Sequence, residues 1–85
     1  PFFLWVDIFD PHEPWDPPAA YLRPEEADIP WILYPRFGEA DRYEEPELEA
    51  IRALYRGEVR MVDHWIGRLL RRVDELGLRD DTVVV

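Results

Sequence analysis

The residues best able to do chemistry lie together in the segment 10–18, Asp-Pro-His-Glu-Pro-Trp-Asp-Pro-Pro. His12 could serve as an acid, a base, a hydrogen-bond donor to an anion or a metal ligand, because imidazole titrates near neutral pH. Four prolines in nine residues exclude a helix and a central strand, so we expect a stiff, largely extended loop. Such a loop is a suitable support for a site, although a proline-rich loop with a histidine is also common as a plain surface connection.

Three acids of this segment, Asp10, Glu13 and Asp16, could offer hard oxygens to a divalent cation. A calcium site needs about six to eight oxygens in a closed arrangement, and the alternating-acid loop with its central glycine is absent. We therefore predict no metal ligand among these residues. Trp15 could wall a pocket or pack in the core, and the sequence does not decide between the two.

A second histidine, His64, follows Asp63 directly. Adjacent residues on a helix do not share a face, so we do not expect a catalytic pair. His64 is interpreted as an exposed helix residue and Asp63 as an ion-pair partner for an arginine such as Arg60. The chain contains no cysteine and no serine, which excludes a thiol or serine nucleophile within these residues.

The elements that would position the loop begin with the nearly continuous apolar run 2–9. Its aromatic and β-branched residues predict a strand covered on both faces, with a helical segment as the alternative. Ligands of open α/β sheets bind beyond the carboxyl ends of the strands, which is where the loop would lie. Asp7, the one polar residue of the run, is more simply bonded to loop backbone than part of a site.

Residues 19–45 show little periodicity and include the proline-bracketed apolar patch 29–35. A patch of this kind could cross the core as an extended or edge piece. Irregular segments of this length are uncommon in compact domains, so we expect this one to be functional or packed against structure elsewhere.

A long helix is predicted over residues 46–76. Pro46 suits its first turn, acids surround its start, and Gly77 suits the left-handed position after its last residue. One apolar stripe with spacings of three and four is expected to pack on a sheet; its members are Ile51, Tyr55, Val59, Val62, Ile66, Leu69 and Val73.

After a turn, residues 82–85 predict the start of another strand. Strand, helical crossover and strand form a βαβ unit with parallel strands, so the predicted class is α/β. Two strands do not make a stable sheet, and the chain begins at a proline and stops inside an apolar run. We therefore expect a segment of a larger protein, completed by the remaining chain of its parent domain.

The 85 residues allow one domain at most. The chain carries 19 acids against 10 arginines and no lysine, a net charge of −9, which argues against nucleic acid and anionic membrane as partners. It has no apolar run approaching the 18 or so residues of a membrane span and no disulfide framework. The redox compartment stays undetermined.

Taken together, several motifs resemble the middle of sulfatases of the alkaline phosphatase-like superfamily. The resemblance covers both ends and the long helix but little of residues 19–45. It rests on Phe-Phe-Leu-Trp-Val-Asp at 2–7, Asp-Pro-His-Glu-Pro-Trp at 10–15, Tyr-Arg-Gly-Glu-Val at 55–59, Val-Asp-His-Trp-Ile-Gly-Arg-Leu-Leu at 62–70, Leu-Gly-Leu at 76–78 and Asp-Thr-Val-Val-Val at 81–85.

The resemblance implies a three-layer α/β sandwich with a central, largely parallel sheet. It also implies a hydrolase of small-molecule or carbohydrate sulfate esters that uses a calcium ion and a formylglycine nucleophile. The nucleophile motif and the metal-binding acids of the family are absent from these residues. Only His12 matches a functional residue of the family, a histidine that contacts the substrate sulfate.

The 85 residues alone are therefore expected to be inactive. Two alternatives stay open at this point. A phosphoester or phosphonate-ester hydrolase of the same superfamily would share this segment almost unchanged. A non-catalytic relative acting as an interaction module is also compatible, since a fold does not imply a function.

Overall fold

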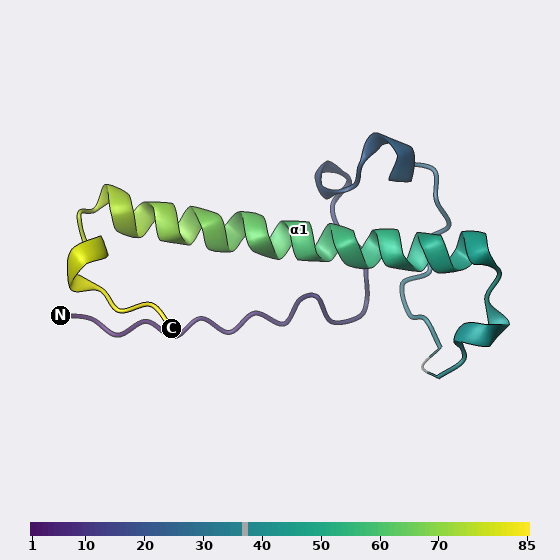
Figure 1. Ribbon diagram of the computed structural model, residues 1–85, viewed down its shortest axis with the longest axis horizontal. Coiled ribbons are helices and arrows are strands. Elements are labelled where there is room, and N and C mark those ends of the chain that lie inside the picture. Colours follow the sequence, from purple (N-terminus) through teal and green to yellow (C-terminus); the bar gives the residue numbers. More distant parts are fainter. Residues whose placement is uncertain (37) are drawn as a thin grey trace.

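The computed structural model describes residues 1–36 and 38–85; Phe37, inside the predicted irregular segment, lies outside the described residues. One long helix, α1 (Glu45–Glu75), dominates the molecule, which measures 52 × 28 × 14 Å (Figure 1). Four single-turn 3₁₀ helices accompany it: η1 (Ala19–Tyr21), η2 (Pro24–Glu26), η3 (Ala40–Arg42) and η4 (Arg79–Asp81). No helix in the described part of the chain is long and apolar enough to cross a bilayer.

The predicted long helix is confirmed, with bounds one residue earlier than 46–76 at each end. At its start, the backbone N–H of Glu44 donates to the carboxylate of Glu47 at 2.9 Å, and Pro46 occupies the first turn. At its end, Gly77 adopts φ +68°, and the Leu78 N–H donates to the Val73 carbonyl at 3.0 Å. This is the predicted glycine cap, in which a left-handed residue allows the chain to reverse.

The predicted α/β class is wrong for this chain. Neither 2–9 nor 82–85 is a strand, and the residues described here contain no sheet, so there is no βαβ unit and no three-layer sandwich. Both segments run without a neighbouring strand to accept and donate ladder hydrogen bonds, and those bonds define a sheet. The apolar side chains of 2–9 are exposed; Phe3 and Trp5 are 88% and 78% accessible.

The predicted packing face of α1 is wrong as well. Tyr55, Val59 and Ile66 of the apolar stripe are 40–41% accessible, whereas the buried positions lie on another side of the helix. These buried positions are Ala50, Ala53, Leu54, Gly57 and Glu58. The physical reason is that irregular chain from the first half of the sequence, and not a sheet, packs against α1.

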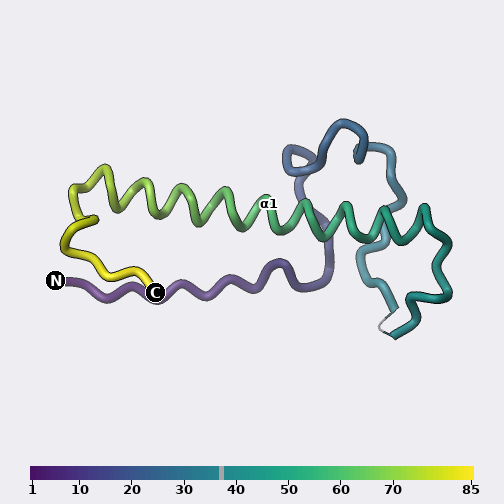
Figure 2. Tube along the Cα trace, viewed as in Figure 1, coloured from purple at the N-terminus to yellow at the C-terminus, as the bar shows by residue number. Residues whose placement is uncertain are grey.

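Residues 10–36 and 38–44 wrap around the N-terminal half of α1 (Figures 1 and 2). The chain turns away from its N-terminal run, passes across α1, forms η1 and η2 on one side and returns along the other side to η3. Pro17 is almost completely buried where it crosses the helix. The wrapped half of α1 therefore contains the small core of the molecule.

The crossing is close because Gly57 has no side chain. A Cβ placed on Gly57 would lie 2.5 Å from Pro17 Cγ and 3.2 Å from a methyl group of Leu22. Pro17 belongs to a rigid ring and cannot move out of the way as a flexible side chain would. Gly57 thus sets how near the proline-rich loop comes to the helix.

We expect Gly57→Ala to lower the free energy of unfolding by about 1–3 kcal/mol, because the added methyl group overpacks the crossing. Gly67→Ala is the matched control, since its Cβ meets only the flexible end of Arg71 at 3.4 Å. Better helix propensity should make this control neutral or stabilising, by up to about 1 kcal/mol. Urea unfolding followed by far-ultraviolet circular dichroism measures both, and equal effects of the two substitutions would contradict the assigned contact.

Candidate functional site

The loop 10–18 turns sharply and is not the largely extended segment that the prolines predict. Its first turn is closed by the His12 N–H, which donates to the Phe9 carbonyl at 3.2 Å, and bends continue through residue 14. This turn redirects the chain from the N-terminal run onto α1 (Figure 1). His12 consequently lies at the outside of a corner, with its side chain 59% accessible.

The environment of His12 determines which ring nitrogen is available. Nδ1 lies 3.0 Å from the Glu13 carbonyl and 3.1 Å from the Glu13 carboxylate, and both are acceptors. We therefore assign the proton to Nδ1, which leaves Nε2 as an acceptor in the neutral ring and as a donor in the protonated ring. The Phe9 ring, 4.5 Å away between centroids, supports the imidazole from one side.

Trp15 fastens the loop in three ways. Its Nε1–H donates to the Pro11 carbonyl at 2.9 Å, and its backbone N–H donates to the Leu33 carbonyl at 3.1 Å. The indole also meets the Tyr55 ring of α1 edge-on, with centroids 5.3 Å apart. A partly buried indole with its N–H satisfied and an aromatic neighbour is well held, so this side chain gives the loop a fixed position on the helix.

Glu58 is the buried charge-bearing residue beneath the loop, and sequence reasoning missed it. Its side chain is part of the core of α1, with the residue 2% accessible, and it accepts a hydrogen bond from the Asp16 backbone. One carboxyl oxygen, Oε2, has no partner. Burial raises the pKa of Glu58, and the nearby charges of Asp10 and Asp16 raise it further. The one signal in the sequence was the position of this acid directly after Gly57.

A second buried acid, Glu26, behaves in the opposite way. Burial alone would raise its pKa, but hydrogen bonds from the Arg23 N–H and from Arg60 and Arg56 outweigh burial and lower it. Both oxygens accept from Arg60 at 2.9–3.0 Å, and Arg60 also donates to the Tyr21 carbonyl. These bonds attach η1 and η2 to α1, and they were not predicted.

The second predicted histidine lies away from the loop, on the exposed surface of α1. The His64 ring lies 5.7 Å from the Tyr21 ring and 5.4 Å from the Trp65 ring, between centroids. Asp63 makes no ion pair in the part of the chain that is described, and Arg60, its predicted partner, binds Glu26 instead. The predicted exposed position of His64 is confirmed, and the predicted ion pair of Asp63 is wrong for the residues that the structure describes.

The acids around the loop do not assemble into a metal site. Across residues 1–36 and 38–85, no group of three or more histidine, aspartate or glutamate side chains is placed to hold a metal ion. The acids considered from sequence, Asp10, Glu13 and Asp16, are part of that result. The donor set does not fit calcium, so no metal chemistry is assigned to these residues.

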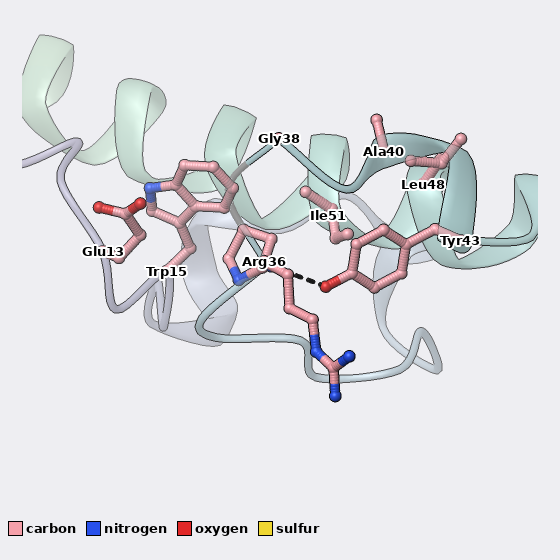
Figure 3. Close-up of a pocket in the computed structure, with 9 residues that line it drawn as sticks. Glu13, Trp15, Arg36, Gly38, Ala40, Tyr43, Leu48 and Ile51 are labelled. Atoms are coloured by element: carbon pink, nitrogen blue, oxygen red, sulfur yellow. Dashed lines mark hydrogen bonds between the residues drawn. The ribbon is translucent and has the colours of Figure 1, made fainter.

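Next to the loop lies a cavity of about 250 Å³ (Figure 3). Glu13 and Trp15 contribute from the loop, Tyr43 from the returning segment, and Leu48 and Ile51 from the first turns of α1. The sequence did not predict it, because its walls come from segments far apart in the chain.

The two buried acids predict opposite responses to pH. The raised pKa of Glu58 means that its protonated form favours the fold. That contribution is present below the unfolded pKa near 4.5 and is lost as pH rises through the folded value. Glu58→Gln stays neutral and keeps an acceptor for the Asp16 N–H. We therefore expect it to unfold at higher urea concentration than wild type at pH 7, with the two converging below about pH 4.5.

Glu26→Gln is the control with the opposite sign. The lowered pKa of Glu26 stabilises the fold above its unfolded value near 4.5, and this contribution is lost as pH falls through the folded value. The variant should therefore be less stable than wild type at pH 7 and nearly equal at low pH. Urea midpoints from tryptophan fluorescence between pH 3 and pH 7 test both. A Glu58→Gln variant that is less stable than wild type at pH 7 would contradict the assignment.

Comparison with known proteins finds similarity to an arylsulfatase. An arylsulfatase of Clostridium perfringens (strain 13 / Type A) is 30% identical over 101 residues, a match that covers 98% of this chain and 20% of the arylsulfatase. The chain thus spans about a fifth of the length of that relative. No family model matches the chain, and no solved structure matches it. The chain is similar to a portion of an arylsulfatase, which agrees with the resemblance noted in its motifs.

Proposed function

We propose that this chain is part of a sulfatase-like hydrolase that cleaves sulfate esters, with His12 in contact with the substrate sulfate. The observation that carries the proposal is the similarity to an arylsulfatase over nearly the whole chain, combined with the loop motif at residues 10–15. The exposed position of His12 at the corner of that loop supports its role.

The chemistry that His12 can supply follows from its hydrogen bonds. Nδ1–H is directed at Glu13, so Nε2 is the nitrogen that can meet a substrate. A sulfate ester presents anionic oxygens, and negative charge grows on its leaving oxygen as the S–O bond breaks. A protonated ring donating from Nε2 would stabilise that charge. The Glu13 carboxylate, 3.1 Å from Nδ1, lies where it can balance the positive ring.

The loop can hold His12 in place before substrate arrives. Pro17 packs closely against Gly57. Trp15 donates hydrogen bonds from its ring N–H and its backbone N–H. The Asp16 N–H donates to buried Glu58. A donor that is already positioned loses little entropy on binding and needs little reorganisation during the reaction. These contacts make the corner of the loop a reasonable place for a catalytic donor.

The remaining chemistry is assigned to other parts of the proposed enzyme. A calcium ion and a formylglycine made from cysteine or serine would supply charge stabilisation and the nucleophile there. No residue described here is given either role, because the local acids do not form a donor set and the chain has neither cysteine nor serine.

In the complete enzyme, His12→Ala should lower turnover of an aryl sulfate by roughly 10²–10³-fold, the range for loss of one preorganised donor. The thermal midpoint should hardly change, because the ring is largely exposed. His64→Ala, the other exposed histidine, serves as the matched control and should leave turnover unchanged. The measurements are kcat/KM on an aryl sulfate and an aryl phosphate, together with the thermal midpoint.

Three results would count against the proposal. Unchanged kinetics of His12→Ala on both esters would remove His12 from the site. Lost activity with an equally large loss of stability would make it structural. Wild-type enzyme that hydrolyses the phosphate but not the sulfate would point to the phosphoester alternative.

A further inference from the structure

Glu58 is a buried acid of α1 to which the proposed reaction gives no role. The residue is 2% accessible, and the Asp16 backbone N–H donates a hydrogen bond to its carboxyl group. The oxygen Oε2 is buried and has no hydrogen-bond partner among the described residues. An ionised carboxylate would therefore lack a donor at one oxygen, whereas a protonated carboxyl group still offers an acceptor to Asp16. The hydrogen bond to the loop does not require the negative charge.

The charged groups that face Glu58 are acids. Asp10 and Asp16, both from the loop, lie close enough to repel a negative charge on Glu58. The two arginines that lie two residues away along the helix do not share a face with Glu58, and both bind Glu26 instead. Burial and the neighbouring acids raise the pKa of Glu58, so this residue keeps its proton to a higher pH than an exposed glutamate does.

Repulsion from an ionised Glu58 would act on the part of the loop that carries His12. Asp10 and Asp16 lie on either side of His12 along the chain. Glu58 itself belongs to a helix of 31 residues, whereas the loop is attached to neighbouring backbone by the N–H groups of His12 and Trp15. Irregular chain opens more easily than a helix of this length, so the loop is the element that would move.

A catalytic donor acts efficiently only where its support keeps it in place. We propose that Glu58 is a positioning residue for His12: its neutral carboxyl group keeps the loop on α1, and loss of the proton releases the loop. This inference rests on the proposed function of His12. Because His12 must also be protonated to donate from Nε2, the support and the donor are both in place at acidic pH.

The test is the pH profile of kcat/KM in the complete enzyme, measured with an aryl sulfate between pH 4 and pH 8. Glu58→Gln stays neutral and keeps an acceptor for the Asp16 N–H at every pH. The ratio of this variant to wild type should be near one at pH 4 and should rise to roughly two- to tenfold at pH 8, the scale of one hydrogen bond. Titration of His12 affects both proteins equally and cancels in this ratio.

Two further variants separate positioning from general stability. Glu58→Ala removes the acceptor and should have a kcat/KM roughly two- to tenfold below that of Glu58→Gln at every pH. Glu26→Gln changes the other buried acid, whose bonds attach η1 and η2 to α1. It should lower the thermal midpoint at pH 7 and leave the pH profile parallel to that of wild type.

A spectroscopic measurement keeps the test independent of turnover. The Trp15 Nε1–H donates to the Pro11 carbonyl at 2.9 Å, so its nuclear magnetic resonance signal reports whether the loop keeps its conformation. In wild type this signal should shift with pH as Glu58 ionises, and in Glu58→Gln that shift should be absent. Equal titration of the signal in both proteins, or a kinetic ratio that stays at one up to pH 8, would overturn the role of Glu58.

The outcomes also separate this inference from the proposed function. Lost turnover in His12→Ala, with parallel pH profiles for Glu58→Gln and wild type, would support the sulfatase function and overturn the positioning role. A Trp15 signal whose titration depends on Glu58, in an enzyme whose turnover does not depend on His12, would support Glu58 as the support of the loop and overturn the role of His12.

Discussion

The arrangement of this molecule depends on the contact between Pro17 and Gly57. A rigid ring lies where a helix has no side chain, and even one methyl group on Gly57 would come within 2.5 Å of the ring. This closeness allows the Asp16 N–H to reach Glu58 and the Trp15 ring to reach Tyr55. The crossing therefore sets where the loop that carries His12 meets the helix.

Electrostatics secures the same region with two buried acids of opposite character. Glu26 lies among arginines that keep it ionised, and its bonds attach the 3₁₀ turns to α1. Glu58 lies beneath two other acids in a chain of net charge −9 and has one oxygen without a partner. Removing one member of a buried ion pair is usually costly, whereas neutralising an isolated buried carboxyl relieves a penalty. The ion pairs of Glu26 therefore stabilise the wrapped region, whereas ionised Glu58 destabilises it.

The sequence predicts local structure well and tertiary contacts poorly. Pro46 and Gly77 act within a turn of the chain, so the start and end of α1 were predicted to within a residue. A strand is different, because the same apolar run 2–9 becomes a strand only beside a partner, and none lies there among the residues described. The buried side of α1 was also missed, because the apolar stripe identifies where a sheet could pack and not where a proline loop crosses.

Prediction of the site divides in the same way. The place of His12 in a site stays a prediction, whereas the exposed helical position predicted for His64 is confirmed, because it depends on short-range spacing alone. Glu58 and the cavity depend on contacts between residues near 15 and residues beyond 40, and residues 19–45 between them carry no periodic signal. The resemblance to sulfatases supplied a role for His12 that the residues alone left open, while the hydrogen bonds of the ring supply the nitrogen that would perform it.

Burial is distributed unevenly along α1, and the candidate site lies beside the buried half. Every buried position of the helix falls between Ala50 and Glu58, in the part around which residues 10–36 and 38–44 wrap (Figure 1). Beyond this part the helix exposes Trp65, Leu69 and Leu70, and the apolar run 2–9 is exposed as well. Local unfolding is easiest where buried contacts are few, and a catalytic donor needs a support that does not open. The proposed role of His12 is compatible with this arrangement, because its loop crosses the wrapped half of α1 where Pro17 meets Gly57.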